Sequence, residues 1–392
     1  MERIEKIRDR IAPSGIDGWL LYEWHGVNPL AADLLALPEG AMVTRRCFYM
    51  IPAKGEPVKI VHKIEENLLS HLPGRRLIYH TKESLHRNLR EVLSGMCRIA
   101  MEYSPMQRIP SVSKVDGGLL DLIRSFGVEV VGSAPFLQEF TAVWSGTQYA
   151  LHKEACAVLE EAVALAWDAI DKTLRKGGMI TEYDLRTMML RHFKEKECVT
   201  EGGPICAVND HAADPHYLPP EEGSAPVRRG DLILFDLWCK KGVKESVFAD
   251  ITRMGVACDA PSPKQREVFS VVRKAQEAGM ERLCKGVDPE ERIPGYVIDR
   301  VVREVIEKSG YGPFFTHRTG HNIGTLLHGP GANLDDFETR DDRLLIPGTC
   351  FSIEPGIYLP GEFGVRLEYD VFIRRDGMPE ATVPPQETFM TL

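Results

Sequence analysis

An internal repeat constrains the fold of this chain more than any other feature of its sequence. Residues 230–236 (GDLILFD) resemble residues 348–354 (GTCFSIE): in each segment a glycine precedes an apolar run, and an acid stands six positions after the glycine. A second acid follows each first acid by 14 positions, so both pairs are offset by 118. Such self-similarity indicates a duplicated structural unit. The four acids at matched positions are Asp236, Asp250, Glu354 and Glu368.

Each half of the repeat is preceded by two segments with helical patterning. An apolar stripe at helical spacing runs from Leu159 to Leu174 and ends at the glycine pair of residues 177–178. Residues 181–184 (TEYD) form a capping box, Ser262-Pro263 open a third helix, and a fourth carries Ile298, Val301 and Val305 and ends at Gly310. We predict two units of two helices and a β-hairpin, related by a pseudo-twofold axis that brings the four acids to one centre.

The region before this repeat follows a different pattern. Short apolar runs at residues 18–22, 47–51, 58–61 and 98–101 read as strands, with amphipathic segments between several of them. This alternation favours a small α/β domain, and it carries no catalytic constellation. Because 392 residues exceed one ordinary core, we predict two domains, residues 1–145 and residues 146–392.

Composition excludes several classes of protein. The net charge of −9 comes without a basic run, so we expect no nucleic-acid partner. Nine cysteines stand singly without a CxxC pair, which argues against a disulfide framework and a thiolate zinc site. No apolar run approaches the ~18 residues needed to span a bilayer, and the N-terminus shows no signal-peptide pattern. We expect a cytoplasmic protein without a membrane partner.

The four acids need a countercharge. Asp236 lies within an apolar strand pattern and would be costly to bury ionised without a partner, and Glu354 is in the same position. Metal is the most economical partner for four carboxylates, and two divalent ions would neutralise them. His321, in residues 317–324 (HRTGHNIG), is the candidate fifth ligand. Carboxylate-rich ligation with one imidazole suits Mn, Co, Fe or Zn, and two such ions can activate water for attack on a carbonyl.

These motifs together resemble those of a known family. Asp236, residues 250–253 (DITR), 317–324, 354–356 (EPG) and 366–368 (RLE) are similar, in order, to the ligand motifs of the aminopeptidase P, prolidase and methionine aminopeptidase superfamily, metallopeptidase family M24. The N-terminal region resembles the creatinase-type domain of its Xaa-Pro branch. The resemblance implies an α/β N-terminal domain followed by an α+β pita-bread catalytic domain with the pseudo-twofold repeat.

The resemblance also implies a role for each residue of the site. Asp236 and Asp250 hold one ion, Glu368 is shared, and His321 with Glu354 completes the other side. Glu354 also takes the proton of the attacking water. His328 stabilises the oxyanion and His216 contacts the leaving nitrogen, while His317 and Arg366 orient the ligands. Two Mn ions are expected, with Co, Zn or Fe as alternatives.

Several residues near the predicted ligands could shape the substrate pocket. Residues 217–220 (YLPP) are the candidate wall for a proline ring, and Arg340 and Arg343 are more simply solvated loop charges than carboxylate-binding groups. Three departures from the family pattern concern the pocket: a longer Asp236–Asp250 interval, Gly329 where an acid is common, and Asn322 where glycine is frequent.

The activity that the resemblance implies is hydrolysis of the bond before proline at a peptide N-terminus, by an aminopeptidase P or a prolidase. The partners expected are a peptide substrate and a second copy in a homodimer. Three alternatives remain: a metallopeptidase without proline specificity, a creatinase-like hydrolase, and a non-catalytic interaction module on the same fold. Retention of all five ligands argues against the last two.

Overall fold

The structure is a computed structural model that describes residues 2–38, 40–285 and 293–392. The chain divides into two compact units, Met1–Thr141 and Ala142–Leu392. The helix predicted to open the second domain, α6, begins at Gly146. Within the described residues, no helix combines the length and the apolar character that crossing a bilayer requires.

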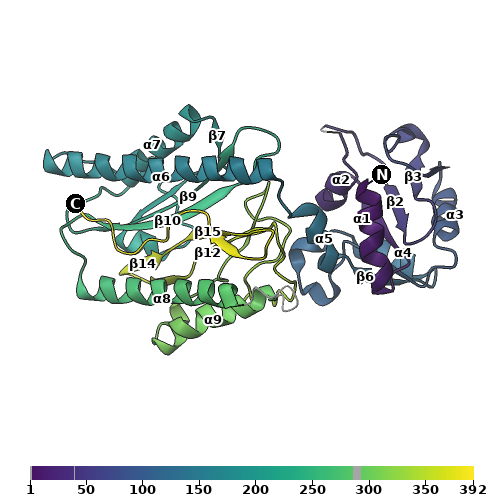
Figure 1. Cartoon of the computed structure of the whole chain (residues 1–392). Coiled ribbons are helices and arrows are strands. Elements are labelled where there is room, and N and C mark those ends of the chain that lie inside the picture. Colours follow the sequence, from purple (N-terminus) through teal and green to yellow (C-terminus); the bar gives the residue numbers. More distant parts are fainter. Residues whose placement is uncertain (1, 39, 286–292) are drawn as a thin grey trace. The chain divides into compact units, whose positions relative to one another are not determined.

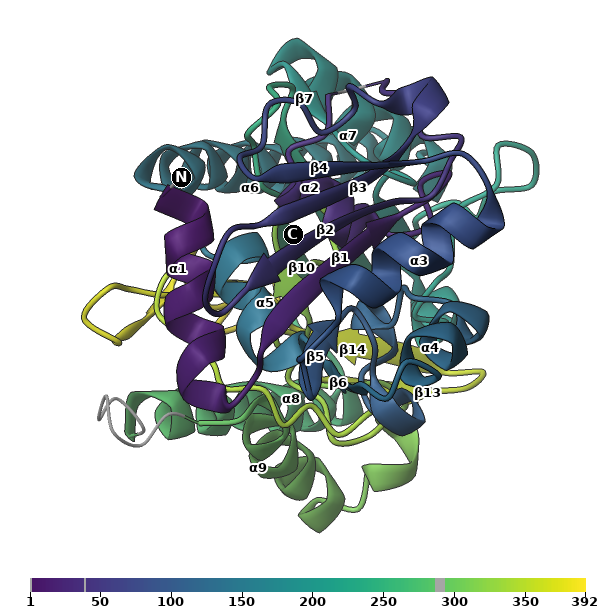
Figure 2. The same ribbon diagram turned by 90° about the vertical axis from the view of Figure 1, so that its right-hand side faces the viewer.

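The first unit is a six-stranded mixed sheet between two layers of helices. The strand order is β4-β3-β2-β1-β5-β6, and only β2 runs antiparallel to its neighbours. Figure 2 shows β4 to β1 side by side in this order. The elements are α1 (Glu2–Ile11), β1 (Gly18–Glu23), α2 (Pro29–Leu34), β2 (Cys47–Pro52), β3 (Val58–His62), β4 (Arg75–Tyr79), α3 (Lys82–Val92), β5 (Arg98–Met101), α4 (Gly117–Arg124), β6 (Glu129–Gly132) and α5 (Ala134–Thr141).

Alternation of side chains along β1 explains the two helix layers. Trp19 and Leu21 pack into one core with residues of α1, α2 and α5. Leu20 and Tyr22 point to the other face and pack with residues of α3 and α4. The predicted α/β domain is therefore confirmed, although the sequence patterns missed β4 and β6. Both are edge strands with charged first residues, so neither shows the continuous apolar run of a central strand.

The second unit places helices on two sides of small sheets. Figure 1 shows α6 and α7 on one side of the strands and α8 and α9 on the other. The elements are α6 (Gly146–Arg175), α7 (Glu182–Glu195), β7 (Cys198–Val199), β8 (Ile205–Val208), β9 (Leu232–Lys241), β10 (Ala249–Val256), α8 (Pro263–Lys285), α9 (Gly295–Lys308), β11 (Asn322–Ile323), β12 (Cys350–Ile353), β13 (Gly356–Leu359), β14 (Phe363–Arg366), β15 (Tyr369–Ile373) and β16 (Pro379–Ala381).

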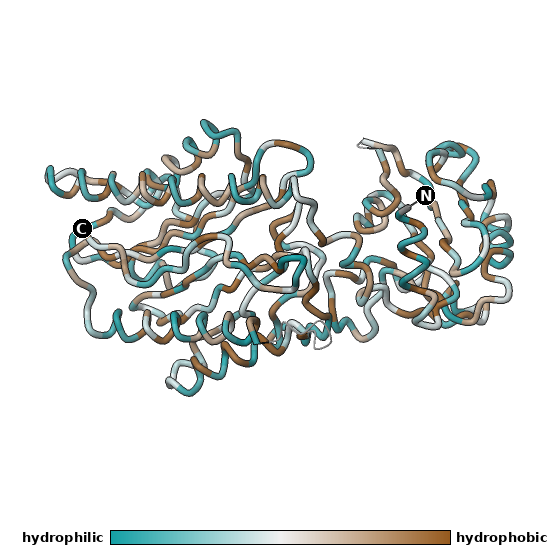
Figure 3. The backbone as a smooth tube through the Cα atoms, viewed as in Figure 1, coloured by the Kyte–Doolittle hydropathy of each residue, from teal (hydrophilic) through white to brown (hydrophobic). Residues whose placement is uncertain are grey.

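Local signals set the ends of these helices. Ser145 and Gln148 form a capping box at the start of α6, and Thr181 with Asp184 forms the predicted one at α7. Figure 3 shows hydrophobic and hydrophilic residues alternating along α6 and α8, as expected for helices with one buried face. The stripe predicted for α9 is displaced by one position. Ile298, Val302 and Ile306 are buried, whereas Val301 and Val305 are only partly so.

The predicted repeat is present as two hairpins with different backbones. In the first hairpin β9 and β10 are continuous and pair over their length. In the second, each arm is interrupted: Glu354 lies between β12 and β13, and Glu368 lies between β14 and β15. An isolated bridge between Thr252 and Glu368 joins the two hairpins. The acids of the first half therefore stand on a regular ladder, and those of the second half stand at strand breaks.

Candidate metal centre

The register of β9 and β10 brings the first pair of acids together. Thr252 lies opposite Asp236, and Asp250 lies opposite Trp238. Cross-strand partners and residues two positions apart share one face of a sheet. All four side chains therefore lie on the same face, and three of them, Asp236, Asp250 and Trp238, line one cavity of about 650 Å³.

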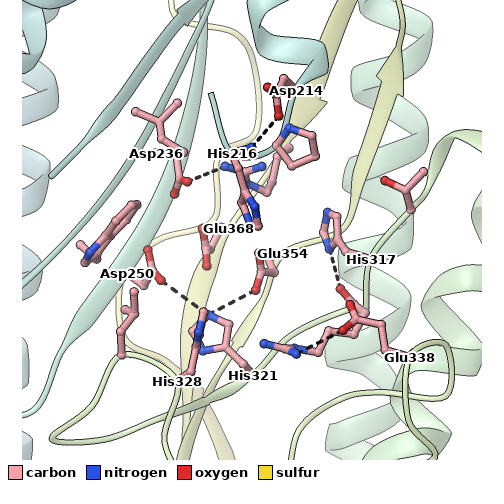
Figure 4. A pocket seen from close by; sticks show the side chains of 17 residues that line it. Asp214, His216, Asp236, Asp250, His317, His321, His328, Glu338, Glu354 and Glu368 are labelled. Atoms are coloured by element: carbon pink, nitrogen blue, oxygen red, sulfur yellow. Dashed lines mark hydrogen bonds and ion pairs between the residues drawn. The ribbon is translucent and has the colours of Figure 1, made fainter. Parts of the chain in front are cut away.

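The second half supplies the remaining predicted ligands to the same cavity. His321 immediately precedes β11, and its backbone is fixed by two hydrogen bonds with Ser352: the His321 N–H donates to the Ser352 hydroxyl, and the Ser352 N–H donates to the His321 carbonyl. Close approach of these segments depends on Gly320, because a Cβ there would lie 1.9 Å from the Ser352 carbonyl oxygen. Figure 4 shows Glu354 and Glu368 reaching toward His321 from the interrupted hairpin.

Three of the predicted ligands form a compact group. One ligand atom from each of Asp250, His321 and Glu368 lies within 4.8 Å of the others, and all three residues are buried. The His321 Nε2 is 3.7 Å from an Asp250 oxygen and 3.4 Å from a Glu354 oxygen. Asp236 stands beside this group but is paired with the buried guanidinium of Arg366.

Burial and mutual repulsion shape the electrostatics of the group. Burial raises the pKa of the Asp250 carboxyl well above its usual range, and the negative charge of Glu368 raises it further. The pKa of Glu368 is raised by burial and then by the charge of Glu354. Burial lowers the pKa of His321 to about 3, so its imidazole is neutral at physiological pH. The protein thus crowds carboxylates around a neutral nitrogen ligand.

This arrangement fits divalent cations. Asp250 Oδ1 and Glu368 Oε1 are buried and have no hydrogen-bond partner among the described residues. Buried carboxylate oxygens without a donor are costly, and a cation between them and the neutral His321 would remove that cost. Oxygen ligands with one imidazole match the donor set of Mn, Co, Fe or Zn.

A hydroxyl and a guanidinium connect the carboxylates behind this group. The Thr252 hydroxyl lies 2.7 Å from Glu368 Oε2 and 3.1 Å from Asp236 Oδ1, and it accepts a hydrogen bond from Arg366 Nε at 3.1 Å. Arg366 also donates to the Tyr358 hydroxyl at 2.9 Å. The Tyr358 hydroxyl in turn contacts His317 Nε2 at 2.7 Å. His317 and Arg366 are thereby held in fixed orientations around the acids.

The three predicted histidines other than His321 stand at different places around the cavity. The His328 ring packs edge-on against His321 with ring centres 4.2 Å apart, and its pKa is lowered chiefly by desolvation. His216 has an exposed side chain on a turn closed by a hydrogen bond from its N–H to the Asp214 carboxylate. His317 is half-buried, and desolvation lowers its pKa to about 4. Figure 4 shows His216 beside Asp214 and His328 beside His321.

Two expectations about the surroundings are wrong. Tyr217 does not line the cavity: its hydroxyl donates to Glu182 at 2.6 Å and its ring stacks on His211. Pro215 lines the cavity instead. Arg343 is not a solvated loop charge, because it is buried in a two-point ion pair with Asp341. Local polar partners account for both differences, and sequence spacing does not reveal them.

The Asn322 and Gly329 departures prove to be a single structural unit. The Asn322 side chain accepts a hydrogen bond from the Gly331 N–H at 2.8 Å and donates one to the Cys350 carbonyl at 2.8 Å. A Cβ on Gly329 would lie 2.3 Å from Asn322 Oδ1. Asn322 therefore occupies the space that a side chain at position 329 would need.

Sequence reasoning did not single out Thr252, Tyr358 or Asp370. Asp370 is fully buried, and its carboxylate accepts the Asp250 N–H at 2.8 Å. Thr252 stands two positions after Asp250 within β10, and that spacing, which puts both side chains on one face, was the available signal. Asp370 offered no such signal, because Glu368 lies in the break before β15. Tyr358 had no such signal, because the break at Glu354 separates its strand from the ligand pattern.

Comparison with known proteins of similar sequence supports the family that the motifs resemble. The sequence model of metallopeptidase family M24 matches residues 150–375. An Xaa-Pro dipeptidase of Lactobacillus helveticus is 33% identical over 228 residues, which are 58% of this chain and 56% of the relative. The putative dipeptidase YkvY of Bacillus subtilis is 30% identical over 263 residues, 67% of this chain and 66% of the relative. The aligned part of the chain thus spans between about half and two thirds of the length of these relatives.

A solved structure with a similar fold supports the predicted architecture. The crystal structure of dipeptidase PepE from Mycobacterium ulcerans has a TM-score of 0.72 at 22% identity, and the match covers 100% of this chain and 97% of that one. The predicted α/β domain followed by a pita-bread domain is confirmed. On the match over residues 150–375, together with its relatives in the Xaa-Pro branch, the chain belongs to metallopeptidase family M24.

Proposed function

We propose that this chain is a metallopeptidase that hydrolyses the bond before proline at the N-terminus of short peptides. One observation carries the proposal: two buried carboxylate oxygens, on Asp250 and Glu368, have no hydrogen-bond partner in the described part of the chain and lie beside the neutral His321 at the wall of a cavity of about 650 Å³. The name of the L. helveticus relative, an Xaa-Pro dipeptidase, supports the choice of substrate.

Five side chains would hold two divalent ions, with Mn first and Co, Zn or Fe as alternatives. They are Asp236, Asp250, His321, Glu354 and Glu368. Such ions, when bound, polarise the scissile carbonyl and lower the pKa of the attacking water. The support for this set is that all five line the same cavity.

We assign the proton of the attacking water to Glu354 and the developing charge to histidines of the cavity. Glu354 is less buried than Asp250 and Glu368, with its side chain 16% exposed, so it can reach an attacking water and take its proton. His328 would donate to the carbonyl oxygen as negative charge develops there. His216 would contact the leaving nitrogen. Both histidines line the cavity.

Arg366 and His317 are proposed to hold this geometry. Arg366 fixes the orientation of Asp236 through their ion pair, and it reaches His317 through the Tyr358 hydroxyl. A network of this kind orients ligands without touching the reacting atoms.

Proline specificity follows from the chemistry of the substrate bond. The bond before proline is a tertiary amide without an N–H, so a pocket with a backbone acceptor gains nothing from it, whereas a histidine near the nitrogen serves it well. Pro215 and Trp238 supply apolar surface in the cavity for the ring. We expect kcat/KM to fall at least ~10-fold when proline in the second position is replaced by alanine.

The test compares Ala-Pro with Ala-Ala, and Ala-Pro-Ala with Ala-Ala-Ala, on protein loaded with Mn, Co or Zn. The dipeptide and tripeptide pairs also separate a prolidase from an aminopeptidase P. Equal rates within each pair would leave a metallopeptidase without the Xaa-Pro preference. Absence of hydrolysis with every metal, in protein shown by elemental analysis to contain metal, would refute the enzyme proposal.

We further propose that the protein is a cytoplasmic homodimer. All nine cysteines are free thiols in the structure, which suits a reducing compartment. Twofold dimers are the commonest oligomers of soluble proteins. Sedimentation at micromolar concentration should give a species of twice the 44.0 kDa chain mass, and a single 44.0 kDa species would reject the dimer.

A further inference from the structure

The N-terminal unit contains a second cavity, of about 800 Å³, whose lining residues all fall between Tyr22 and Leu122. It lies where β1, β3 and β4 end: Trp24 follows β1, His62 is the last residue of β3, and Tyr79 is the last residue of β4. In open α/β sheets, ligands bind outside the carboxyl ends of the strands. The cavity therefore occupies the edge of the sheet where such folds form ligand sites.

The lining of this cavity is cationic. Arg45 and Arg46 immediately precede β2, and since β2 runs antiparallel, its first residues lie at the same edge. Lys82 is the first residue of α3, just after β4. Among the lining residues that the structure describes, the one acid is Asp116, which caps α4 by accepting the Leu119 N–H. A local excess of positive charge is notable in a chain with net charge −9.

Two of these cations are unpaired among the residues that the structure describes. Neither the Arg46 guanidinium nor the Lys82 ammonium forms a hydrogen bond or an ion pair with any residue that the structure describes. An exposed lysine alone is ordinary solvated surface, but Arg46 is partly buried. The nearby carboxylate of Glu65 is already taken by the Thr44 N–H and hydroxyl and by the Arg45 N–H. Positive charge is thus left available to an external anion.

The rest of the lining suits an organic anion. The N-terminal ends of α3 and α4 border the cavity, and the helix dipole adds partial positive charge there. Trp24 lines the cavity with 42% of its surface exposed, and its indole offers an apolar face. The volume of about 800 Å³ is in the range of small-molecule sites and exceeds the needs of a single inorganic oxyanion.

We propose that the N-terminal domain binds a small organic polyanion in this cavity, through the guanidinium of Arg46, the ammonium of Lys82 and the indole of Trp24. The shared chemistry is a cluster of oxyanion charges attached to an apolar group, as in a phosphate ester or a polycarboxylate. The site is independent of the metal centre and of the peptidase activity proposed above.

The experiment is calorimetric titration of the full chain at low ionic strength with two probes, AMP as a phosphate ester and succinate as a polycarboxylate. Adenosine serves as the uncharged control for AMP. Binding should also change the fluorescence of Trp24, and the Trp24→Phe variant should lose that signal. Whichever probe binds identifies the source of the anion.

Variants locate the binding. Arg46→Ala and Lys82→Ala should each weaken binding about tenfold, the scale of one charge-assisted contact. The matched control is Arg75→Ala, which removes a cation from β4 that is already paired with Glu91 at the surface, and it should leave affinity unchanged. If Arg46→Ala fails to fold, the exposed Lys82 still carries the test. No binding of either probe at millimolar concentration would overturn the proposal, as would binding that survives both variants, which would place the anion elsewhere in the chain.

Discussion

Replacing Thr252 by valine tests whether the buried hydroxyl prepares the carboxylates for metal. The hydroxyl has one proton, and the 2.7 Å contact with Glu368 Oε2 is shorter than the 3.1 Å contact with Asp236, so Glu368 receives it. Valine keeps the shape of the side chain but leaves both Glu368 and Arg366 Nε without this partner. A hydrogen bond to a charged group contributes about 1.5–3 kcal/mol.

A loss of that size corresponds to a fall in metal affinity of about 10–100-fold, the usual range for groups that orient ligands. The assay is calorimetric titration of chelated protein with Mn²⁺, with the free energy of unfolding measured in parallel. The matched control is Thr349→Val, another buried threonine, whose hydroxyl donates to the Ile346 carbonyl rather than to a ligand. Metal affinity of Thr252→Val within about twofold of the parent chain would refute the reasoning, as would an equal loss in the control.

Three further predictions concern the same centre. Asp250→Ala should lower metal content and abolish hydrolysis while the fold survives, because most of the burial in each hairpin is apolar; full activity of well-chelated protein would contradict the metal mechanism. His328→Ala should lower kcat by ~10²–10³-fold with metal content unchanged, and loss of metal would instead make His328 a ligand. Because the pKa values of Asp250 and Glu368 are raised, the folded metal-free chain retains protons there that metal must displace. Metal affinity should therefore rise with pH, and calorimetry in two buffers should detect proton release; a pH-independent affinity without proton release would be evidence against the raised pKa values.

The ligand pattern was readable from the sequence because strands repeat every two residues and the repeat supplied a second copy for comparison. Asp236 and Glu354 each follow an apolar strand pattern, where an ionised side chain needs a partner, and this argument located them without any structure. The shared spacing of 14 positions then pointed to Asp250 and Glu368. The structure brings all four acids to one cavity with His321.

The hydrogen bonds that hold the ligands in place could not be predicted from the sequence. Arg366 reaches Asp236 across 130 positions of sequence, and Asp370 reaches the Asp250 N–H across 120. Such pairings depend on how the two hairpins meet, which local patterns do not specify. The Tyr217 error has a similar cause, since its hydroxyl donates to Glu182 on α7 and no local pattern indicates that this carboxylate lies nearby.

Edge strands were also difficult to predict from the sequence. β4 and β6 begin with charged residues and lie at the two ends of the N-terminal sheet, so half of each strand's backbone hydrogen-bonding capacity faces away from the sheet. Their side-chain patterns resemble those of loops. Central strands such as β1, buried along their whole length, were found because hydrophobic burial leaves its mark in the sequence.

The packing of Asn322 against Gly329 also restricts the order in which substitutions at these positions can be accepted. An acid introduced at position 329 would begin with a Cβ 2.3 Å from Asn322 Oδ1, and one at position 331 would meet the same side chain at 2.6 Å. A side chain at either glycine therefore clashes with Asn322 while that residue remains, and Asn322→Gly as the first step relieves the clash. Losing the asparagine also removes its hydrogen bonds to Gly331 and Cys350, so this first step costs stability. Mutational libraries that aim to reshape the rim beside His328 should vary positions 322 and 329 together, because their fitness effects are coupled.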